Sequence, residues 1–195
     1  MTAVSPRAFS GVLLAAGHSI RMHRDKALLE IEGTVMWRRQ RDLLAAAGAT
    51  ELLLSARSDQ AWAEAAEGFT ATVRDVSLDS GPLGGIAAAL ARGTSSHLAV
   101  LAVDLPKMTP AWFTTRWAEC VPGVGVVGRI GKFFEPLAAI YPRELGRLAQ
   151  AALERRELSL QKLLAAGVAQ NLLRVHEISA EEAPLFANWN EPTGP

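Results

Sequence analysis

Leu13–Glu30 reads LLAAGHSIRMHRDKALLE and joins an apolar run to a short basic loop. The apolar run, residues 11–16, is long enough for a buried strand and too short for a core helix. Gly17 follows, where the chain must turn and backbone N–H groups can approach a ligand. The nine residues 18–26 hold three cations and a single acid: Arg21, Arg24, Lys26 and Asp25. This pattern favours a polyphosphate site and a merely basic, solvated loop about equally.

The composition around this stretch favours one globular domain, which we expect to span residues 1–195. This length suits a single core that buries roughly 70% of the unfolded surface, and a hydrophobic content of 49% excludes a disordered chain. Twenty basic residues cancel twenty acidic ones, so the chain as a whole lacks the charge of a nucleic-acid-binding surface. The basic loop is therefore a local feature, better sized for a small anion.

Nothing in the sequence predicts a membrane protein or an oxidising compartment. No segment approaches the ~18 consecutive apolar residues of a membrane span. The apolar residues 9–17 are too few, and lack a convincing cleavage site, for a signal peptide. The single cysteine, Cys120, cannot form an internal disulfide. We therefore expect a cytoplasmic protein.

Apolar runs alternate with helical patterns along the chain, which predicts an α/β fold. We expect a single-domain three-layer α/β/α sandwich with a mostly parallel, Rossmann-like sheet. Strands are expected at 11–16, 51–56, 71–74, 98–103, 123–128, 136–141 and 171–176. Helices are expected at 37–47, 61–66, 83–92, 110–120, 143–154 and 160–166. The most apolar run, 98–103, should be the central strand, because both of its faces must be buried.

Two glycine motifs in residues 123–133 are rejected as nucleotide sites. Residues 123–128 match G-x-G-x-x-G, but the valines make the match itself a strand, where the fingerprint needs a strand before it and a helix after it. Residues 125–132 resemble a phosphate loop, but the spacing is one residue too long and Phe133 replaces the serine or threonine.

A family resemblance runs through the chain, starting from the basic loop. Residues 14–29 resemble the signature L-A-G/A-G-x-S-x-R-M-G-x-D-K-x-L-L of nucleotidyltransferases, and more narrowly of the MobA-like molybdenum cofactor guanylyltransferases. The resemblance continues, in the family's order, at 81–86 (GPLGGI), 103–106 (VDLP) and 186–192 (FANWNEP). It implies a fold of the nucleotide-diphospho-sugar transferase type and Mg²⁺ as cofactor.

The resemblance also implies a reaction. GMP would pass from GTP to Mo-molybdopterin, which gives the guanine dinucleotide cofactor and pyrophosphate. Molybdoenzyme maturation proteins are further candidate partners, and we favour a monomer.

Asp104 and Lys26 are the leading candidates for chemistry. Asp104 follows the central strand, where open α/β sheets bind ligands, and its hard oxygens suit Mg²⁺ held together with substrate phosphates. The alternative is that Asp104 caps a helix or forms an Asx turn. The neighbouring basic loop favours a metal site. The resemblance implies that Asp104 binds both Mg²⁺ and the nucleotide. Nucleotidyl transfer depends on positioning and on neutralising phosphate charge, so Lys26 is the expected catalytic cation.

The basic loop contains two further residues of interest. Arg21, with its planar fork, is expected to act on the triphosphate or the leaving pyrophosphate, whereas Arg24 has no counterpart in the signature. His23 stands where the signature has glycine, a departure that we attribute to the tolerance of histidine for unusual backbone angles.

Other nucleotide contacts are implied by the resemblance alone: Leu14, Ala15, Ala16, Gly17, Arg57, Asp75 and Gly81. Arg57 replaces an asparagine, and an arginine cannot both donate and accept. Asp75 can accept from a purine or a ribose, or can cap a loop. The glycines of 81–85 would let a ligand pass close to the backbone at a helix start, rather than merely interrupt the chain.

The tail resembles the family's F-x-N-x-N-T-P motif, although Glu191 replaces the threonine. The resemblance implies that Asn188 and Asn190 contact the pterin. The alternative is that the two asparagines only cap backbone groups. The choice of guanine is weakened by Ala15-Ala16-Gly17, which stands where Ala-Gly-Gly is commoner. A cytidylyltransferase for the same pterin, or a MobA-like transferase for a sugar or alcohol phosphate, therefore remains an alternative. His23 and Arg57 suggest a second rival, a catalytically weak nucleotide-binding accessory protein.

Overall fold

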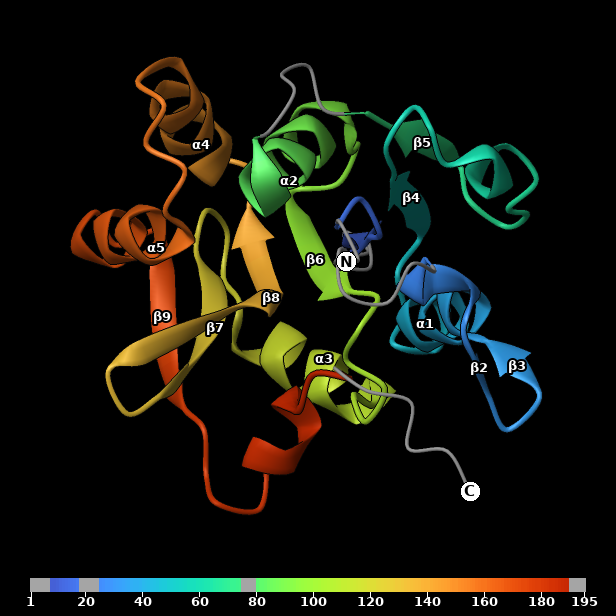
Figure 1. The fold of residues 1–195 in the computed structure, drawn as a ribbon. Coiled ribbons are helices and arrows are strands. Elements are labelled where there is room, and N and C mark those ends of the chain that lie inside the picture. Colours follow the sequence, from blue (N-terminus) through green and yellow to red (C-terminus); the bar gives the residue numbers. More distant parts are fainter. Residues whose placement is uncertain (1–7, 18–24, 75–79, 190–195) are drawn as a thin grey trace, which may run out of the picture.

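A computed structural model describes residues 8–17, 25–74 and 80–189, and one sheet forms its centre (Figure 1). Within these residues the sheet has seven strands in the order β5-β4-β1-β6-β8-β7-β9. The strands are β1 (Ser10–Leu14), β4 (Glu51–Ser55), β5 (Ala71–Val73), β6 (His97–Ala102), β7 (Gly125–Ile130), β8 (Phe133–Pro142) and β9 (Leu173–Glu177). All seven expected strands are therefore present, with ends shifted by a few residues.

The sheet is mostly parallel, as predicted. Strands β5, β4, β1 and β6 run parallel, and so do β7 and β9. Strand β8 is antiparallel to both of its neighbours, β6 and β7. A two-residue connection links β7 to β8, with Gly131 at φ 58°, and such a short connection can only join antiparallel strands.

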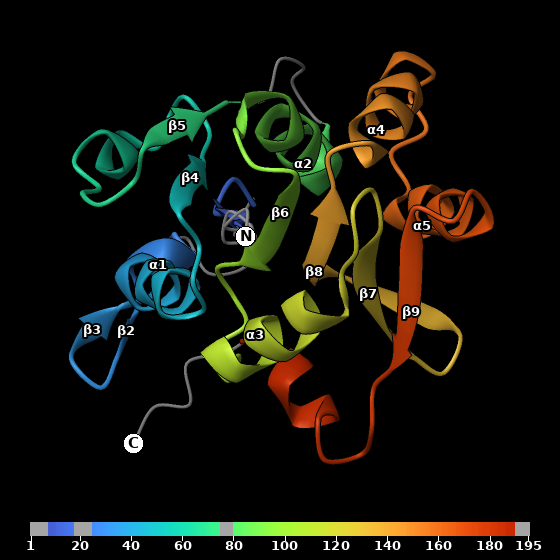
Figure 2. The ribbon, with the colours of Figure 1, turned by 180° about the vertical axis from the view of Figure 1, so that it is seen from behind.

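Helices cover both faces of the sheet (Figures 1 and 2). Helices α1 (Met36–Ala46) and α3 (Pro110–Glu119) lie on one face, and α2 (Gly81–Arg92), α4 (Leu145–Glu154) and α5 (Leu160–Ala169) on the other. Each face has its own buried cluster: Leu44 and Phe113 belong to one, and Ile86, Ala149 and Leu164 to the other. The three-layer α/β/α sandwich is confirmed.

Strand β6 is the middle strand of the sheet, as its apolar sequence predicted. All six of its residues are buried. Ala99 and Leu101 enter the cluster under α1 and α3, whereas Leu98 and Val100 enter the cluster under α2, α4 and α5. A strand covered on both faces needs apolar side chains at successive positions, so this run is continuous rather than alternating.

Several short elements were not predicted. Strands β2 (Glu30–Ile31) and β3 (Thr34–Val35) form a separate hairpin whose turn residues, Glu32 and Gly33, both have positive φ. Single 3-10 turns occur at η1 (Lys26–Leu28) and η3 (Ala183–Phe186). A third, η2 (Ala61–Glu64), replaces the helix expected at 61–66. Elements of two to four residues are too short to show a hydrophobic period. Among the described residues, no helix has the length and apolar character needed to cross a membrane.

Part of the rejected glycine motif lies in strand β7, as expected. Close packing explains why two of its positions are glycine. A Cβ atom at Gly125 would lie 2.0 Å from the carbonyl oxygen of Ile140 on β8, and one at Gly128 would lie 2.7 Å from Cδ1 of Ile178. Gly123 has φ 75°, in the turn before the strand. Gly125 and Gly128 therefore permit close packing, and Gly123 permits the turn.

We expect Gly125→Ala to lower the free energy of unfolding by about 1–3 kcal/mol, because β7 and β8 must move apart to admit the methyl group. Denaturant unfolding measures the loss. Gly146→Ala in α4 is the matched control: its new Cβ would meet Leu90 Cβ at 3.6 Å, an ordinary contact, and alanine is favoured over glycine in a helix. Equal stability of the two variants would contradict the packing argument.

Candidate active site

The carboxyl ends of three neighbouring parallel strands bring the candidate residues to one edge of the sheet. Leu14, the last residue of β1, pairs with Ser55 on β4 and with Ala102 on β6. Ala15–Gly17 follow the end of β1 directly, and Arg57 and Asp104 come two residues after the ends of β4 and β6. This edge is where open α/β sheets bind ligands.

Lys26 and Asp104 form an ion pair at this edge. The distance from Lys26 Nζ to Asp104 Oδ2 is 3.0 Å, and each side chain is 23% exposed. The two residues lie 78 positions apart in the sequence. Asp104 does not cap the next helix, because α3 begins at Pro110 with Thr109 in the N-cap position. The structure therefore joins the two leading candidates in one partly buried pair.

The segment after Asp104 is held by a buried glutamine of α1. Gln40 is fully buried, and its Nε2 donates a 2.7 Å hydrogen bond to the carbonyl oxygen of Leu105. Leu105 is itself buried in the core beside α1 and α3. Asp104 thus stands on a rigid support, and sequence reasoning missed Gln40 because nothing local marks a helical glutamine as buried.

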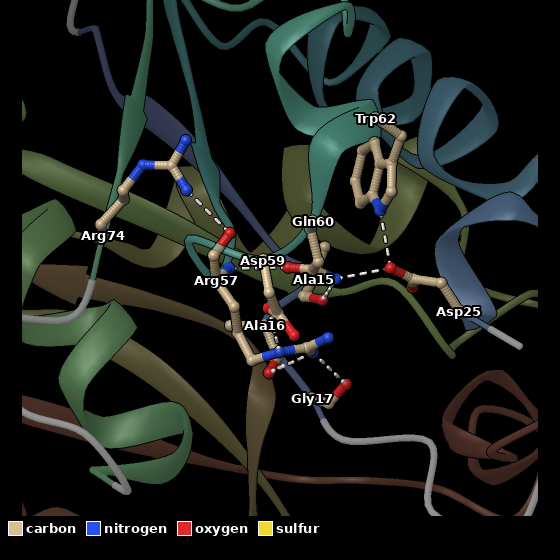
Figure 3. Close-up of polar contacts among 9 residues, drawn as sticks. All are labelled: Ala15, Ala16, Gly17, Asp25, Arg57, Asp59, Gln60, Trp62 and Arg74. Carbon is tan, nitrogen blue, oxygen red and sulfur yellow. Dashed lines mark hydrogen bonds and ion pairs between the residues drawn. The ribbon is translucent and has the colours of Figure 1, made fainter. Parts of the chain in front are cut away.

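Asp25 positions Lys26 from the preceding residue. Its Oδ1 accepts the backbone N–H of Ala27 at 3.0 Å and so caps η1, the turn that begins at Lys26. Its Oδ2 accepts from Gln60 Nε2 and from Trp62 Nε1, each at 2.6 Å (Figure 3). In the sequence Asp25 is only the single acid of a basic loop, but in the structure it is the centre of a hydrogen-bond network. Gln60 and Trp62 had no signal in the sequence.

Arg57 lies against the end of β1, close to the expected nucleotide loop. Its Nη1 donates to the carbonyl oxygens of Ala16 and Gly17 at 3.0 and 2.9 Å, and its Nε pairs with Asp59 at 2.9 Å (Figure 3). Arg74 Nη1 in turn donates to the Arg57 carbonyl oxygen at 2.7 Å. In this structure the guanidinium binds backbone oxygens of the loop.

The C-terminal tail returns to Asp104. The backbone N–H of Trp189 donates to the Asp104 carbonyl oxygen at 2.9 Å. Asn188, directly before it, is exposed at this edge of the sheet. Phe186 anchors the tail, since it is buried and packs edge-on against Trp112 with ring centroids 4.9 Å apart. The fold therefore brings the predicted pterin-contacting segment to the Lys26–Asp104 pair.

The glycines at the start of α2 need a correction. A Cβ atom at Gly85 would lie 2.4 Å from Ser55 Oγ and 3.2 Å from Leu14 Cδ2. Gly85 thus lets α2 pack closely on β4 and β1, and the close approach is to the sheet rather than to a ligand. Gly81 differs, because it has φ 56° and open space where a side chain would stand. Of the predicted site residues, Arg21, Asp75 and Asn190 lie outside the described residues, as do His23, Arg24 and Glu191.

Glu135 is a further carboxylate that sequence reasoning missed. It lies on β8 opposite Gly128 of β7, and burial raises the pKa of its carboxyl group. Asp104 remains the acid that the structure pairs with Lys26. Within residues 8–17, 25–74 and 80–189, no three metal-ligating side chains form a cluster. A single carboxylate still suits Mg²⁺, which is commonly held by one or two carboxylates together with substrate phosphates.

Comparison with known proteins identifies the family of the chain. Residues 11–173 match the family model of the MobA-like NTP transferase domain. A probable molybdenum cofactor guanylyltransferase from Opitutus terrae is 40% identical over 188 residues, which cover 95% of this chain and 92% of the relative.

Two solved structures show the same fold. Molybdopterin-guanine dinucleotide biosynthesis protein A from Archaeoglobus fulgidus superposes with a TM-score of 0.70 at 17% identity, over 94% of this chain and 93% of that one. The 2-C-methyl-D-erythritol 4-phosphate cytidylyltransferase from Thermus thermophilus gives a TM-score of 0.68 at 15% identity, over 95% and 94%. The family match spans the strands and the loop that build the edge described above. The chain belongs to the MobA-like NTP transferase family.

Proposed function

We propose that this protein is a molybdenum cofactor guanylyltransferase, which transfers GMP from GTP to Mo-molybdopterin and releases pyrophosphate. The observation that carries the proposal is the Lys26–Asp104 pair beside Ala15–Gly17, at the carboxyl edge of the sheet. A cation and a carboxylate held together there suit a metal-bound triphosphate. The 40% identity to a relative of that name, over 95% of the chain, supports the choice of reaction.

In the proposed reaction, the terminal phosphate oxygen of the pterin attacks the α-phosphorus of GTP in line. The new bond joins that oxygen to the α-phosphorus, and the bond from the α-phosphorus to the bridging oxygen breaks, so pyrophosphate leaves with the electron pair. Lys26 neutralises charge that builds up on the transferring and leaving phosphates. Arg21 assists on the pyrophosphate side. Residues 14–17 line the triphosphate, and the backbone N–H groups of Ala16 and Gly17 are its donors, because the Ala15 N–H already donates to the Ser55 carbonyl oxygen at 2.8 Å.

Asp104 is the residue that would hold Mg²⁺, with phosphate oxygens as further ligands. Bound there, the ion would supply electrostatic stabilisation of the phosphate oxygens. Lys26 donates to the Asp104 carboxylate at 3.0 Å, which keeps both side chains at the edge of the sheet.

The remaining predicted contacts divide between the two substrates. We assign Arg57, Asp75 and Gly81 to the nucleotide, and Asn188 and Asn190 to the pterin. The support for the second assignment is the hydrogen bond that places Trp189, next to Asn188, on the backbone of Asp104.

Binding of GTP with Mg²⁺ is expected to stabilise the fold more than binding of CTP does. At about a hundred times the dissociation constant, the gain is about 2.7 kcal/mol. Thermal unfolding with GTP, CTP and UDP-sugars, each with and without Mg²⁺, measures the order. A larger shift with CTP would replace the proposal by a cytidylyltransferase. If no nucleotide shifts the transition, both transferase assignments fail.

A further inference from the structure

We propose that Gln60 and Trp62 are positioning residues, which direct the Lys26 ammonium to Asp104 by occupying the carboxylate of Asp25. The inference deepens the proposed function and rests on it for the role of Lys26. Both act through Asp25, whose Oδ2 accepts a hydrogen bond from each of them (Figure 3).

Gln60 uses both ends of its buried side-chain amide. The residue is only 3% exposed. Its Oε1 accepts the backbone N–H of Arg57 at 2.6 Å, and its Nε2 donates to the Ala15 carbonyl oxygen at 2.9 Å and to Asp25 Oδ2 at 2.6 Å. The partners fix the orientation of the amide, because a backbone N–H needs an acceptor and a carbonyl oxygen needs a donor. Gln60 therefore ties the end of β1 to the start of η1.

Trp62 supplies the second donor and is held by another aromatic ring. Its Nε1 donates to Asp25 Oδ2 at 2.6 Å. Its ring stacks on Trp37 of α1, with centroids 6.2 Å apart and planes 22° apart. Trp37 is buried, so the indole N–H of Trp62 is aimed from a rigid platform.

Asp25 would otherwise compete for Lys26. The two residues are adjacent, and an unoccupied carboxylate next to an ammonium is a natural ion-pair partner. Two donors on Oδ2 and the Ala27 N–H on Oδ1 satisfy the Asp25 carboxylate with charge-assisted hydrogen bonds. The Lys26 ammonium then pairs with Asp104 across the edge of the sheet. Removing a donor frees Asp25 to draw Lys26 away from the reacting phosphates.

A double-mutant cycle between Trp62→Phe and Lys26→Ala tests the inference. Phenylalanine keeps an aromatic ring on Trp37 but loses the N–H donor. We expect Trp62→Phe to lower the turnover number for GMP transfer about tenfold to a hundredfold, the scale for misplacing a positioned group. In the Lys26→Ala background the same substitution should change turnover less than twofold. A role in packing alone would lower turnover by the same factor in both backgrounds.

Trp117→Phe is the matched control, because it trims a tryptophan that packs on Phe9, before the amino end of β1, with ring centroids 5.1 Å apart, and it leaves Trp37, Trp62 and the bond to Asp25 in place. Its effect on turnover should be the same with and without Lys26. Gln60→Met, which removes the other donor at similar length, should show the same coupling to Lys26→Ala as Trp62→Phe. Melting temperatures of all variants establish that they are folded.

The same cycle measured by calorimetric binding of inorganic triphosphate separates this inference from the proposed function. Triphosphate carries no base and needs no acceptor substrate. Wild-type protein that transfers no GMP overturns the proposed function. The positioning inference fails by itself if Trp62→Phe leaves both turnover and triphosphate affinity unchanged, or weakens triphosphate binding equally with and without Lys26.

Discussion

Lys26→Ala is expected to lower turnover by about 10²–10³-fold, the scale of losing one preorganised transition-state stabiliser. Its ammonium is held at 3.0 Å from Asp104, at the carboxyl edge of the sheet. The affinity for GTP is expected to fall as well, because the ground-state triphosphate is also anionic. Steady-state turnover and melting temperature, measured on the same preparation, separate lost chemistry from lost folding.

Lys162→Ala is the control for removing a lysine. Lys162 is exposed on α5, in the layer on the other face of the sheet from α1 and α3. Its substitution should leave turnover unchanged, since surface charges so placed do not reach the substrate. Near wild-type turnover of a folded Lys26→Ala variant would refute the catalytic role of the pair and the mechanism built on it.

Asp104→Asn is the second large effect, and it should abolish metal-dependent turnover while the fold persists. Asparagine keeps the shape of the side chain but lacks the charge that a hard divalent cation prefers. Metal ions contribute several kcal/mol of charge stabilisation to such reactions, so turnover should fall by about 10²–10³-fold or more. Initial rates across a Mg²⁺ titration measure the change.

Two outcomes would contradict this role for Asp104. An Asp104→Asn variant that does not fold would show that the carboxylate is structural. A folded and active variant would place the metal elsewhere, with Asp75 as the next candidate. Asp42→Asn is a suitable control and should leave turnover unchanged, because its carboxylate is largely exposed on α1 and pairs at 2.6 Å with Arg41, a residue assigned to neither substrate.

Much of the candidate site could be predicted because chain order determines where strands end. Residues 11–16 and 98–103 are apolar runs, and such runs become parallel strands whose carboxyl ends lie on one edge. Gly17 and Asp104 follow those runs directly, so both were expected at that edge, and the pairing of β1 with β6 in the structure makes the two strand ends neighbours. The expectation that Lys26 is the catalytic cation rests on the cations and the signature around it.

The contacts within the site could not be predicted, because they join residues far apart in the chain. Gln60 looks like an ordinary polar residue after a strand, yet it is 3% exposed and bonded to Asp25 and Ala15. Gly85 was expected near a ligand, and it faces Ser55 instead. Such facts depend on how closely a helix packs on the sheet, and local sequence carries no signal for that distance.

The sequence by itself determined the α/β class, the seven strands, the central place of β6 and the edge where the site lies. These follow from hydrophobic period and from residues at strand ends, which are local properties. The tertiary structure decided the antiparallel direction of β8 and the pairing of Lys26 with Asp104. It also decided the hydrogen bonds that Gln60 and Trp62 donate to Asp25. Each of these depends on side chains or strands brought together only when the two cores close around the sheet.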